Sequence, residues 1–308
     1  MTGLEHHAGF NLTSNKLQFV EISLKSDEFI VDNIDEVYLN EFLNLKEDKE
    51  TKIVSILQAA YDELIIKKPL NSSAVSFSLP LDVFLSLQLP LEASLLHQDI
   101  IEEFKWEFSV IYPHLKIDDY IFQYFEIEKN RFVKYNSSIV SAVPRKILQV
   151  LHSFCKSNKL HLRFVDNVHF ASDKAILLNQ IFILNGIVLS LYISDKTISI
   201  ELMEAGLPVF YKVIFLESIS QLVETLNNIF SDDSLKPFDK KMIESVFLSG
   251  DEISLNFIQS FEENFGIRTY AVQSFGKISV DSNLFDSKYY SDKFFTFSSA
   301  AGISFRLA

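Results

Sequence analysis

Cysteine is nearly absent from this sequence. Cys155 is the only one, so the chain can form neither an internal disulfide nor a cysteine-based zinc site. Its neighbours place it on the apolar side of an expected helix, and we interpret it as a core residue rather than a nucleophile. The histidines are scattered apart from the adjacent His6 and His7, so we expect no metal site.

Long hydrophobic runs are also missing. The longest, residues 175–191, is interrupted by Asn179, Gln180, Asn185 and Gly186, whereas a membrane span needs about 20 apolar residues. The opening MTGLEHHAGF lacks the basic and apolar parts of a signal peptide. We therefore expect a cytoplasmic protein that does not insert directly into a membrane.

Positive charge is in deficit, with 28 Lys and Arg against 41 Asp and Glu and a net charge of −13. No basic cluster stands clear of acidic neighbours, so nucleic acid and anionic membrane surfaces are poor candidate partners. Apolar residues are plentiful at 48%, including 29 Phe and 11 Tyr. A chain of 308 residues with this composition can bury a large core and is long enough for about two domains.

Hydrophobic periodicity predicts an α/β protein in which strands and helices alternate. The order hairpin, strand, helices, strand occurs twice, at a spacing of about half the chain. The expected strands are two within 8–32 and then 74–79, 84–89, 120–127, 139–143, 160–165, 187–193, 197–203, 207–215, 245–248 and 269–272. The expected helices are 47–67, 92–111, 145–156, 171–183, 216–230, 239–244 and 253–265.

A strand, turn and strand occur near residue 10 and again near residue 190, and two further short motifs follow in the second half. These segments are GFNLTSNKLQFVE at 9–21, YISDKTI at 192–198, LSGD at 248–251 and AAGISFR at 300–306. In this order the motifs resemble the actin-like ATPase superfamily and, within it, the PilM family of type IV pilus assembly proteins, which is similar to the cell-division protein FtsA. Two further motifs agree with the family pattern, namely SLP at 78–80 followed by LP at 89–90, and IVSAVPRKILQVLHSFCKSNKLHLRFVD at 139–166. The sequence is identified as a member on these six weak motifs in one order, spread over nearly the whole chain.

The resemblance implies an actin-like two-lobed fold with an inserted α+β subdomain of the FtsA and PilM type. On this basis we expect the inserted subdomain at 75–165 and the second lobe at 187–296. The first lobe would be assembled from 1–74, 166–186 and 297–308.

The turns depart from the family's nucleotide-binding pattern. Asn11 stands in place of an Asp, Gln18 of a Lys, Tyr192 of an Asp and Asp251 of a Gly, and Thr13 and Ser194 also replace glycines. Glycines let backbone N–H groups approach a phosphate, and the acidic residues position a divalent metal. We therefore expect a vestigial cleft with no ATP or Mg²⁺, no catalytic residue and no enzymatic activity. Its residues would be Asn11, Thr13, Ser14, Gln18, Ser194, Thr197 and Gly250.

An alternative is an actin-like switch that still binds ATP. Hydroxyl groups of Thr13, Ser14 and Thr197 would then replace the lost groups, and the retained Gly250 and Gly302 support this interpretation. Asp195 would be a substitute metal ligand, although Ser-Asp-Lys is also ordinary hairpin-turn chemistry.

The resemblance implies a scaffold that grips the cytoplasmic peptide of a PilN-like bitopic inner-membrane protein, with the pilus motor ATPase as a second candidate partner. The protein would be cytoplasmic and held at the inner membrane through its partner. Capture would use strand addition and a groove between the first and inserted subdomains. We expect the groove on the strand 120–127, with an acidic rim that favours a basic peptide. Its partner-binding rings would be Tyr120, Phe122 and Tyr124, and its rim Asp118, Asp119, Glu126 and Glu128.

Overall fold

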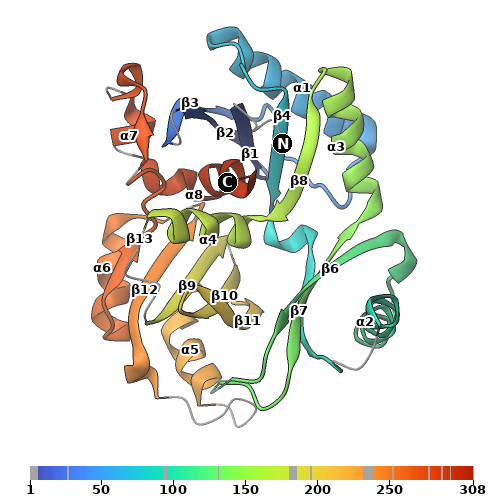
Figure 1. Ribbon diagram of the computed structural model, residues 1–308, viewed down its shortest axis with the longest axis vertical. Helices are drawn as coiled ribbons and strands as arrows, with labels where there is room; N and C mark the ends of the chain where they lie inside the picture. Colours follow the sequence, from blue (N-terminus) through green and yellow to red (C-terminus); the bar gives the residue numbers. More distant parts are fainter. Residues whose placement is uncertain are drawn as a thin grey trace.

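The computed structural model describes residues 6–25, 28–92, 96–130, 132–179, 186–194, 196–231, 239–251, 253–276, 278–285, 287–291 and 293–307. They form two lobes, each built on a sheet, and a smaller unit of sheet and helix beside them (Figure 1). None of the described helices combines the length and apolar character that crossing a membrane requires.

The first lobe contains a six-stranded sheet in the order β14-β3-β2-β1-β4-β8. Strands β1, β2 and β3 form an antiparallel meander, while β1, β4 and β8 run parallel. The strands are β1 (His6–Leu12), β2 (Lys16–Lys25), β3 (Glu28–Tyr38), β4 (Ala74–Leu79), β8 (His161–Asn167) and β14 (Ser279–Val280).

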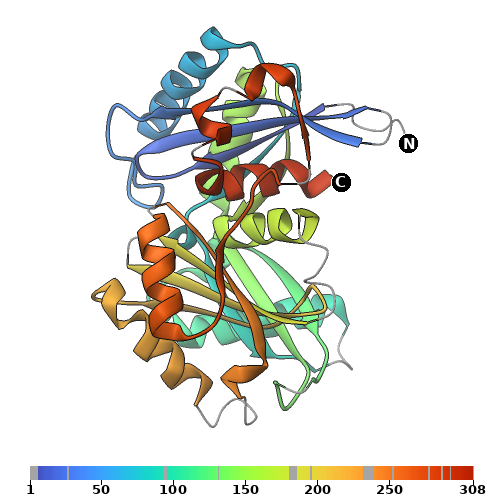
Figure 2. The same cartoon turned by 90° about the vertical axis from the view of Figure 1, so that its left-hand side faces the viewer.

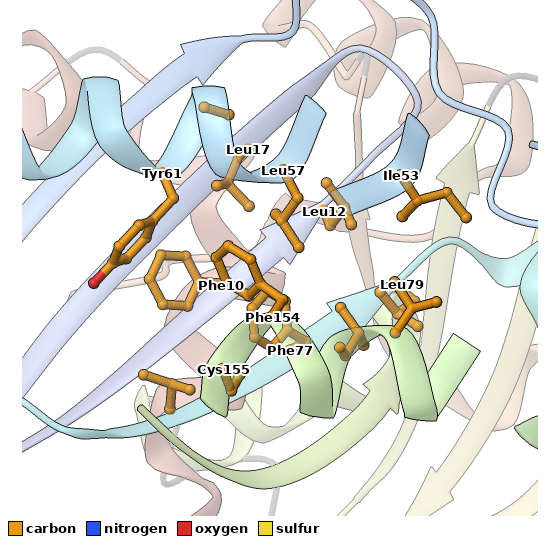
Figure 3. Close-up of a cluster of buried hydrophobic side chains, with 14 of the residues drawn as sticks. Phe10, Leu12, Leu17, Ile53, Leu57, Tyr61, Phe77, Leu79, Phe154 and Cys155 are labelled. Atoms are coloured by element: carbon orange, nitrogen blue, oxygen red, sulfur yellow. The ribbon is translucent and has the colours of Figure 1, made fainter. Parts of the chain in front are cut away.

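Helices α1 (Glu50–Lys67) and α3 (Arg145–Ser157) cover one face of this sheet. The buried side chains of α1 recur at helical spacing, which is the stripe that the sequence predicts. Figure 3 shows how Phe10 and Phe77 from the sheet pack against Tyr61 of α1 and Phe154 of α3. Cys155 is buried in the same cluster, and its exclusion from solvent raises the pKa of the thiol to about 12.

The second lobe contains a five-stranded sheet in the order β11-β10-β9-β12-β13. Helices α5 (Leu222–Phe230) and α6 (Leu255–Phe265) pack on one of its faces. The helix expected at 239–244 is wrong: residues 240–242 form a single 3-10 turn, and Ile243 pairs with β9. The strands are β9 (Ile187–Ser194), β10 (Thr197–Glu204), β11 (Leu207–Phe215), β12 (Ile243–Gly250) and β13 (Thr269–Ala271).

The inserted unit consists of a three-stranded antiparallel sheet, in the order β5-β7-β6, and helix α2 (His97–Ile111). Helix α2 begins later than the expected 92, and residues 93–95 lie outside the described part. The expected range 75–165 is also too wide, because β4 and β8 hydrogen-bond within the first sheet and α3 packs on it. Likewise, β14 of the expected second lobe pairs with β3. The three strands are β5 (Leu85–Pro90), β6 (Tyr120–Ile127) and β7 (Ser137–Pro144).

Two helices, α4 (Val168–Asn179) and α8 (Ser298–Ser304), lie between the lobe sheets (Figure 2). The helix expected at 171–183 begins earlier, at Val168, and residues 180–183 of that expectation lie outside the described residues. The small helix α7 (Lys288–Ser291) lies beside β3. Glycines set how closely α8 approaches its neighbours: a Cβ on Gly302 would lie 1.6 Å from the carbonyl oxygen of Ala171, and one on Gly9 would lie 2.3 Å from that of Ala300.

Candidate functional site

The expected cleft between the lobes is present. The turn between β1 and β2 faces the turn between β9 and β10 across a cavity of about 280 Å³. Four of the predicted residues line it, namely Thr13, Ser14, Ser194 and Thr197. The loop of residues 42–45 and the turn at 80–83 form the rest of the first-lobe wall. Asp195, the proposed substitute ligand, lies outside the described residues.

The first turn is closed by its own side chains. The Thr13 hydroxyl donates to Asn15 Oδ1 at 2.9 Å and accepts from the backbone N–H of Lys16 at 3.1 Å. The adjoining loop is hydrogen-bonded to the turn, because Leu43 N–H donates to the Ser14 carbonyl at 2.8 Å. The Thr13 hydroxyl, one of the groups that an ATP-binding turn would use, is therefore engaged within the hairpin turn itself.

Asn11 and Gln18 do not line the cleft. Both are buried on neighbouring strands, where Asn11 Nδ2 donates to Gln18 Oε1 at 3.1 Å. Gln18 Nε2 donates in turn to Glu36 at 3.0 Å, and Lys293 donates to the other oxygen of Glu36 at 3.2 Å. Ser78 completes the chain by donating to Asn11 Oδ1 at 3.1 Å. The Asp and Lys positions of the family motif are thus occupied by amides that satisfy each other.

The second turn is linked to the LSGD turn. Tyr192 is 1% exposed, and its hydroxyl donates to Asp251 Oδ1 at 3.3 Å. Ser194 donates to the other oxygen of Asp251 at 3.1 Å. Burial holds the pKa of Tyr192 well above its ordinary value, with the Asp251 charge as the next cause. The ring therefore stays a neutral donor where the family motif has a carboxylate.

The retained glycines have structural explanations. Gly250 has φ of +145°, and a Cβ there would lie 2.0 Å from the carbonyl oxygen of Ile193 on the neighbouring strand. Gly302 is required for the close contact between α8 and α4. Neither glycine therefore needs a nucleotide to account for it.

A second polar cluster is buried where α4 meets β9 and β10. The two ring nitrogens of His169 lie 2.7 Å from Ser199 Oγ and 3.0 Å from Ser190 Oγ, and Ser190 donates to Asp173 at 2.5 Å. Burial lowers the pKa of His169 to about 3, raises that of Asp173 to about 7 and raises that of Glu201 well above its usual range. Because these side chains are closed to solvent, we interpret the cluster as a tie between α4 and the second sheet.

Sequence reasoning missed this cluster. Its only local signal is the spacing of His169 and Asp173, four residues apart on one helix face. Among the residues that the structure describes, no group of three or more His, Cys, Asp or Glu is arranged to hold a metal ion.

A larger groove of about 610 Å³ lies between the first lobe and the inserted unit. Its lining includes the consecutive residues 162–166 of β8, together with Ile121, Gln123 and Phe125 from one face of β6. Within the described part of the chain, β8 pairs only with β4. Alternate backbone N–H and C=O groups on the other edge of β8 therefore have no neighbouring strand among the described residues. Phe125 and Phe164 are 46% and 41% exposed there.

The three rings predicted to bind a partner lie on the opposite face of β6. Tyr124 packs against Phe104 of α2, with ring centroids 5.4 Å apart, and Phe122 packs against Phe108 at 5.1 Å. Tyr120 belongs to the same partly buried cluster under α2. Side chains alternate along a strand, so the residues of β6 that reach the groove are the odd-numbered ones.

The groove is lined mainly by apolar side chains, with His152, Arg163 and Arg306 as its basic residues, and none of the residues of the expected acidic rim lines it. It shares His152, Leu162 and Arg163 with an adjoining hollow of about 410 Å³. The sequence analysis overlooked this basic stretch, which has no acidic residue between 145 and 163. The hollow is lined by His152, Lys156, Lys159, Leu160, His161, Leu162 and Arg163.

Comparison with known proteins identifies the fold. Neither a protein-family model nor a curated protein matches the sequence. A chain of a PilM–PilN type IV pilus biogenesis complex matches with a TM-score of 0.70 and 15% identity, over 98% of both chains. A Bacteroides thetaiotaomicron protein with an actin-like ATPase fold and unknown function matches with a TM-score of 0.52 and 11% identity, over 87% of this chain and 91% of that one. The protein therefore has the α/β actin-like fold predicted from its turns, in a form similar to that found in the pilus complex.

Proposed function

We propose that this protein is a cytoplasmic scaffold of a type IV pilus-like inner-membrane assembly complex. It holds the cytoplasmic peptide of a PilN-like membrane partner in the groove along β8, and through that partner it is kept at the membrane. The observation that carries the proposal is that the edge strand β8 and an apolar face of β6 line the same groove. Contact with the pilus motor ATPase, which the resemblance implies, stays a prediction.

The groove suits an extended peptide. Strand addition to β8 would supply main-chain hydrogen bonds along 162–166. Alternate side chains of the added strand would then pack on Ile121 and Phe125 of β6 or lie beside Phe164. The likeness to a chain of a PilM–PilN complex supports this kind of occupant, although at 15% identity it establishes the fold alone.

The cleft between the lobes, in this proposal, binds no nucleotide, and the protein is not an enzyme. Three features support this. Asn11 and Gln18 are held by each other, Tyr192 is tied to Asp251, and the Thr13 hydroxyl closes its own turn. Gly250 and Gly302 no longer favour the alternative of an ATP-binding switch, because close backbone contacts explain both glycines.

Calorimetry with a synthetic peptide tests the scaffold role. The peptide is the cytoplasmic segment of the PilN-like protein encoded in the same genome. We expect Phe164→Asp to abolish its binding, because the substitution places a charge on the apolar lining of the groove. Trp106→Asp is the matched control, since Trp106 is 63% exposed on α2 and does not line the groove. Equal binding by both variants, or no binding by the unaltered protein, would contradict the proposal.

Titration with Mg-ATP tests the second part. We expect no heat of binding and no hydrolysis above background. Hydrolysis that disappears in Thr197→Ala would show that the cleft is active and would favour the switch. The two titrations are independent, because the cleft and the groove share no lining residue.

A further inference from the structure

The basic hollow at the end of α3 is the surface feature that the proposed function does not use. Its lining has five side chains that are basic or histidine, all exposed, and no acidic residue among those described. This locally positive surface contrasts with the net charge of the chain, which is −13. These residues are His152, Lys156, Lys159, His161 and Arg163.

The positive charges of the hollow have no acidic partner in the described part of the chain. Over the residues that the structure describes, Lys156, Lys159 and Arg163 make no ion pair or side-chain hydrogen bond. The one acidic residue lining the adjoining groove, Asp166, is engaged by Arg306, whose Nε donates to it at 2.9 Å. A ligand that enters the groove therefore meets positive charge without a local counter-ion.

The hollow continues the groove rather than forming a separate site. His152, Leu162 and Arg163 line both cavities, at the end of β8 where the strand begins. The other end of the groove carries the apolar rings of Phe125 and Phe170, 5.8 Å apart, beside the ion pair of Asp166 and Arg306. One extended segment could therefore contact both the apolar end and the basic end.

We infer that the segment bound along β8 carries acidic side chains at one end, and that these lie in the basic hollow formed by α3 and β8. This inference rests on the proposed function and adds the charge and direction of the partner segment. Cytoplasmic residues next to a membrane span are enriched in Lys and Arg. The acidic end therefore lies away from the membrane, and the membrane-proximal end leaves the groove near Phe125.

A peptide fits the hollow better than an anionic membrane surface does. The basic residues surround a concave hollow, which a flat bilayer cannot fill. The net charge of −13 also repels an anionic bilayer at long range. Binding to vesicles is therefore the competing outcome of the test.

The experiment compares two variants that lose the same charge. One is Lys156→Gln, Lys159→Gln and Arg163→Gln together. The control is Lys212→Gln, Lys241→Gln and Lys288→Gln, three exposed positions away from the groove. The probe is the fluorescently labelled cytoplasmic segment of the PilN-like protein from the same genome, measured by anisotropy at 50 mM and 300 mM NaCl. A second probe has every Asp and Glu of this segment changed to Asn and Gln.

We expect the hollow variant to bind the native segment about tenfold more weakly at low salt, with a smaller loss at high salt, because the contacts are charge pairs near solvent. The control variant should differ less than twofold. With the amide probe, the hollow variant and the unaltered protein should bind equally, since the two changes remove the same interaction.

Three results would overturn the inference while the scaffold role stands. They are an equal effect of the two variants, an undiminished difference with the amide probe, and a bound segment that contains no Asp or Glu. Loss of binding to vesicles containing 30% phosphatidylglycerol, with unchanged affinity for the segment, would instead assign the hollow to a membrane. If the native segment binds neither the unaltered protein nor the control variant, the proposed function itself fails.

Discussion

The hydroxyl of Tyr192 donates a hydrogen bond to Asp251 Oδ1 across 3.3 Å, which joins the second turn of the cleft to the LSGD turn. Each residue departs from the motif of the actin-like ATPases, and the two departures partner each other. A bulky ring beside the cleft is thereby given a fixed acceptor, and the acidic side chain is given a donor. The contact accounts for two substitutions that look unrelated in the sequence.

Removing the Tyr192 hydroxyl should destabilise the protein by about 1 kcal/mol, the net contribution of a typical buried hydrogen bond. The measurement is urea denaturation of Tyr192→Phe, Asp251→Ala and the double variant. We expect coupling between the two sites, with Tyr135→Phe as the control because Tyr135 is 55% exposed. Additive effects within experimental error would show that the contact contributes nothing to stability.

Restoring the family's acidic residue with Asn11→Asp should destabilise the fold by about 2 kcal/mol at pH 8. A carboxylate oxygen would replace the Nδ2 that now donates to Gln18 Oε1, so two acceptors would face each other. Gln18 cannot turn over without losing its bond to Glu36.

The deficit of Asn11→Asp should be smaller at pH 4.5, where a protonated carboxyl can donate. Burial raises the pKa of such a group, so its protonated form stabilises the fold at low pH, and that stability is lost as the pH rises. The exposed Asn228→Asp serves as a control and should change stability by less than about 0.5 kcal/mol. A deficit that does not vary with pH would contradict the assigned hydrogen bond.

Gly302→Ala should destabilise the fold by about 3 kcal/mol, because the added Cβ would overlap the backbone of α4 rather than a side chain that can move aside. Gly266→Ala is a useful contrast, since no atom lies within 4 Å of the Cβ position and only its φ of +75° opposes the change. That variant should lose about 1 kcal/mol. Comparable losses from the two variants in urea denaturation would mean that α4 and α8 separate easily.

Stability should depend on pH through the buried carboxyl of Asp173. Its pKa is raised to about 7 by burial, so its contribution is fully present below about pH 4, the pKa of an unfolded Asp. That contribution is lost as the pH rises toward 7. His169, with its pKa lowered to about 3, acts in the opposite direction between pH 3 and its ordinary value of 6.5. Because the two effects partly offset each other, the contribution of Asp173 is best measured by comparing the unaltered protein with a variant that lacks this carboxyl.

The relevant variant is Asp173→Asn, compared with the unaltered protein by urea denaturation at pH 5 and pH 8. Between pH 5 and about pH 7, the pKa of the folded carboxyl, the difference in unfolding free energy should move in favour of the variant by about 1.4 kcal/mol for each pH unit. His169 is present in both proteins and largely cancels. If the two proteins lose stability in parallel from pH 5 to pH 8, Asp173 does not titrate in this range.

Local sequence determined which segments form strands and helices, because apolar residues recur with the period of each structure. The stripe on α1 and the alternation along β6 show this directly. The order of the short motifs along the chain was also enough to predict the actin-like fold. The departures from the nucleotide-binding motif of the actin-like ATPases are also visible in the sequence, since Asn11, Gln18 and Tyr192 stand at motif positions.

Only the tertiary structure decided which residues partner each other. Alternation separates Tyr124 from Phe125, but packing of α2 decides which of them is covered. Pairing within the first sheet fixes where the inserted unit begins and ends. Tyr192 and Asp251 are 59 positions apart, and no periodicity links them. Periodicity reports how far a side chain is buried, whereas the identity of its neighbour depends on long-range packing that local sequence does not encode.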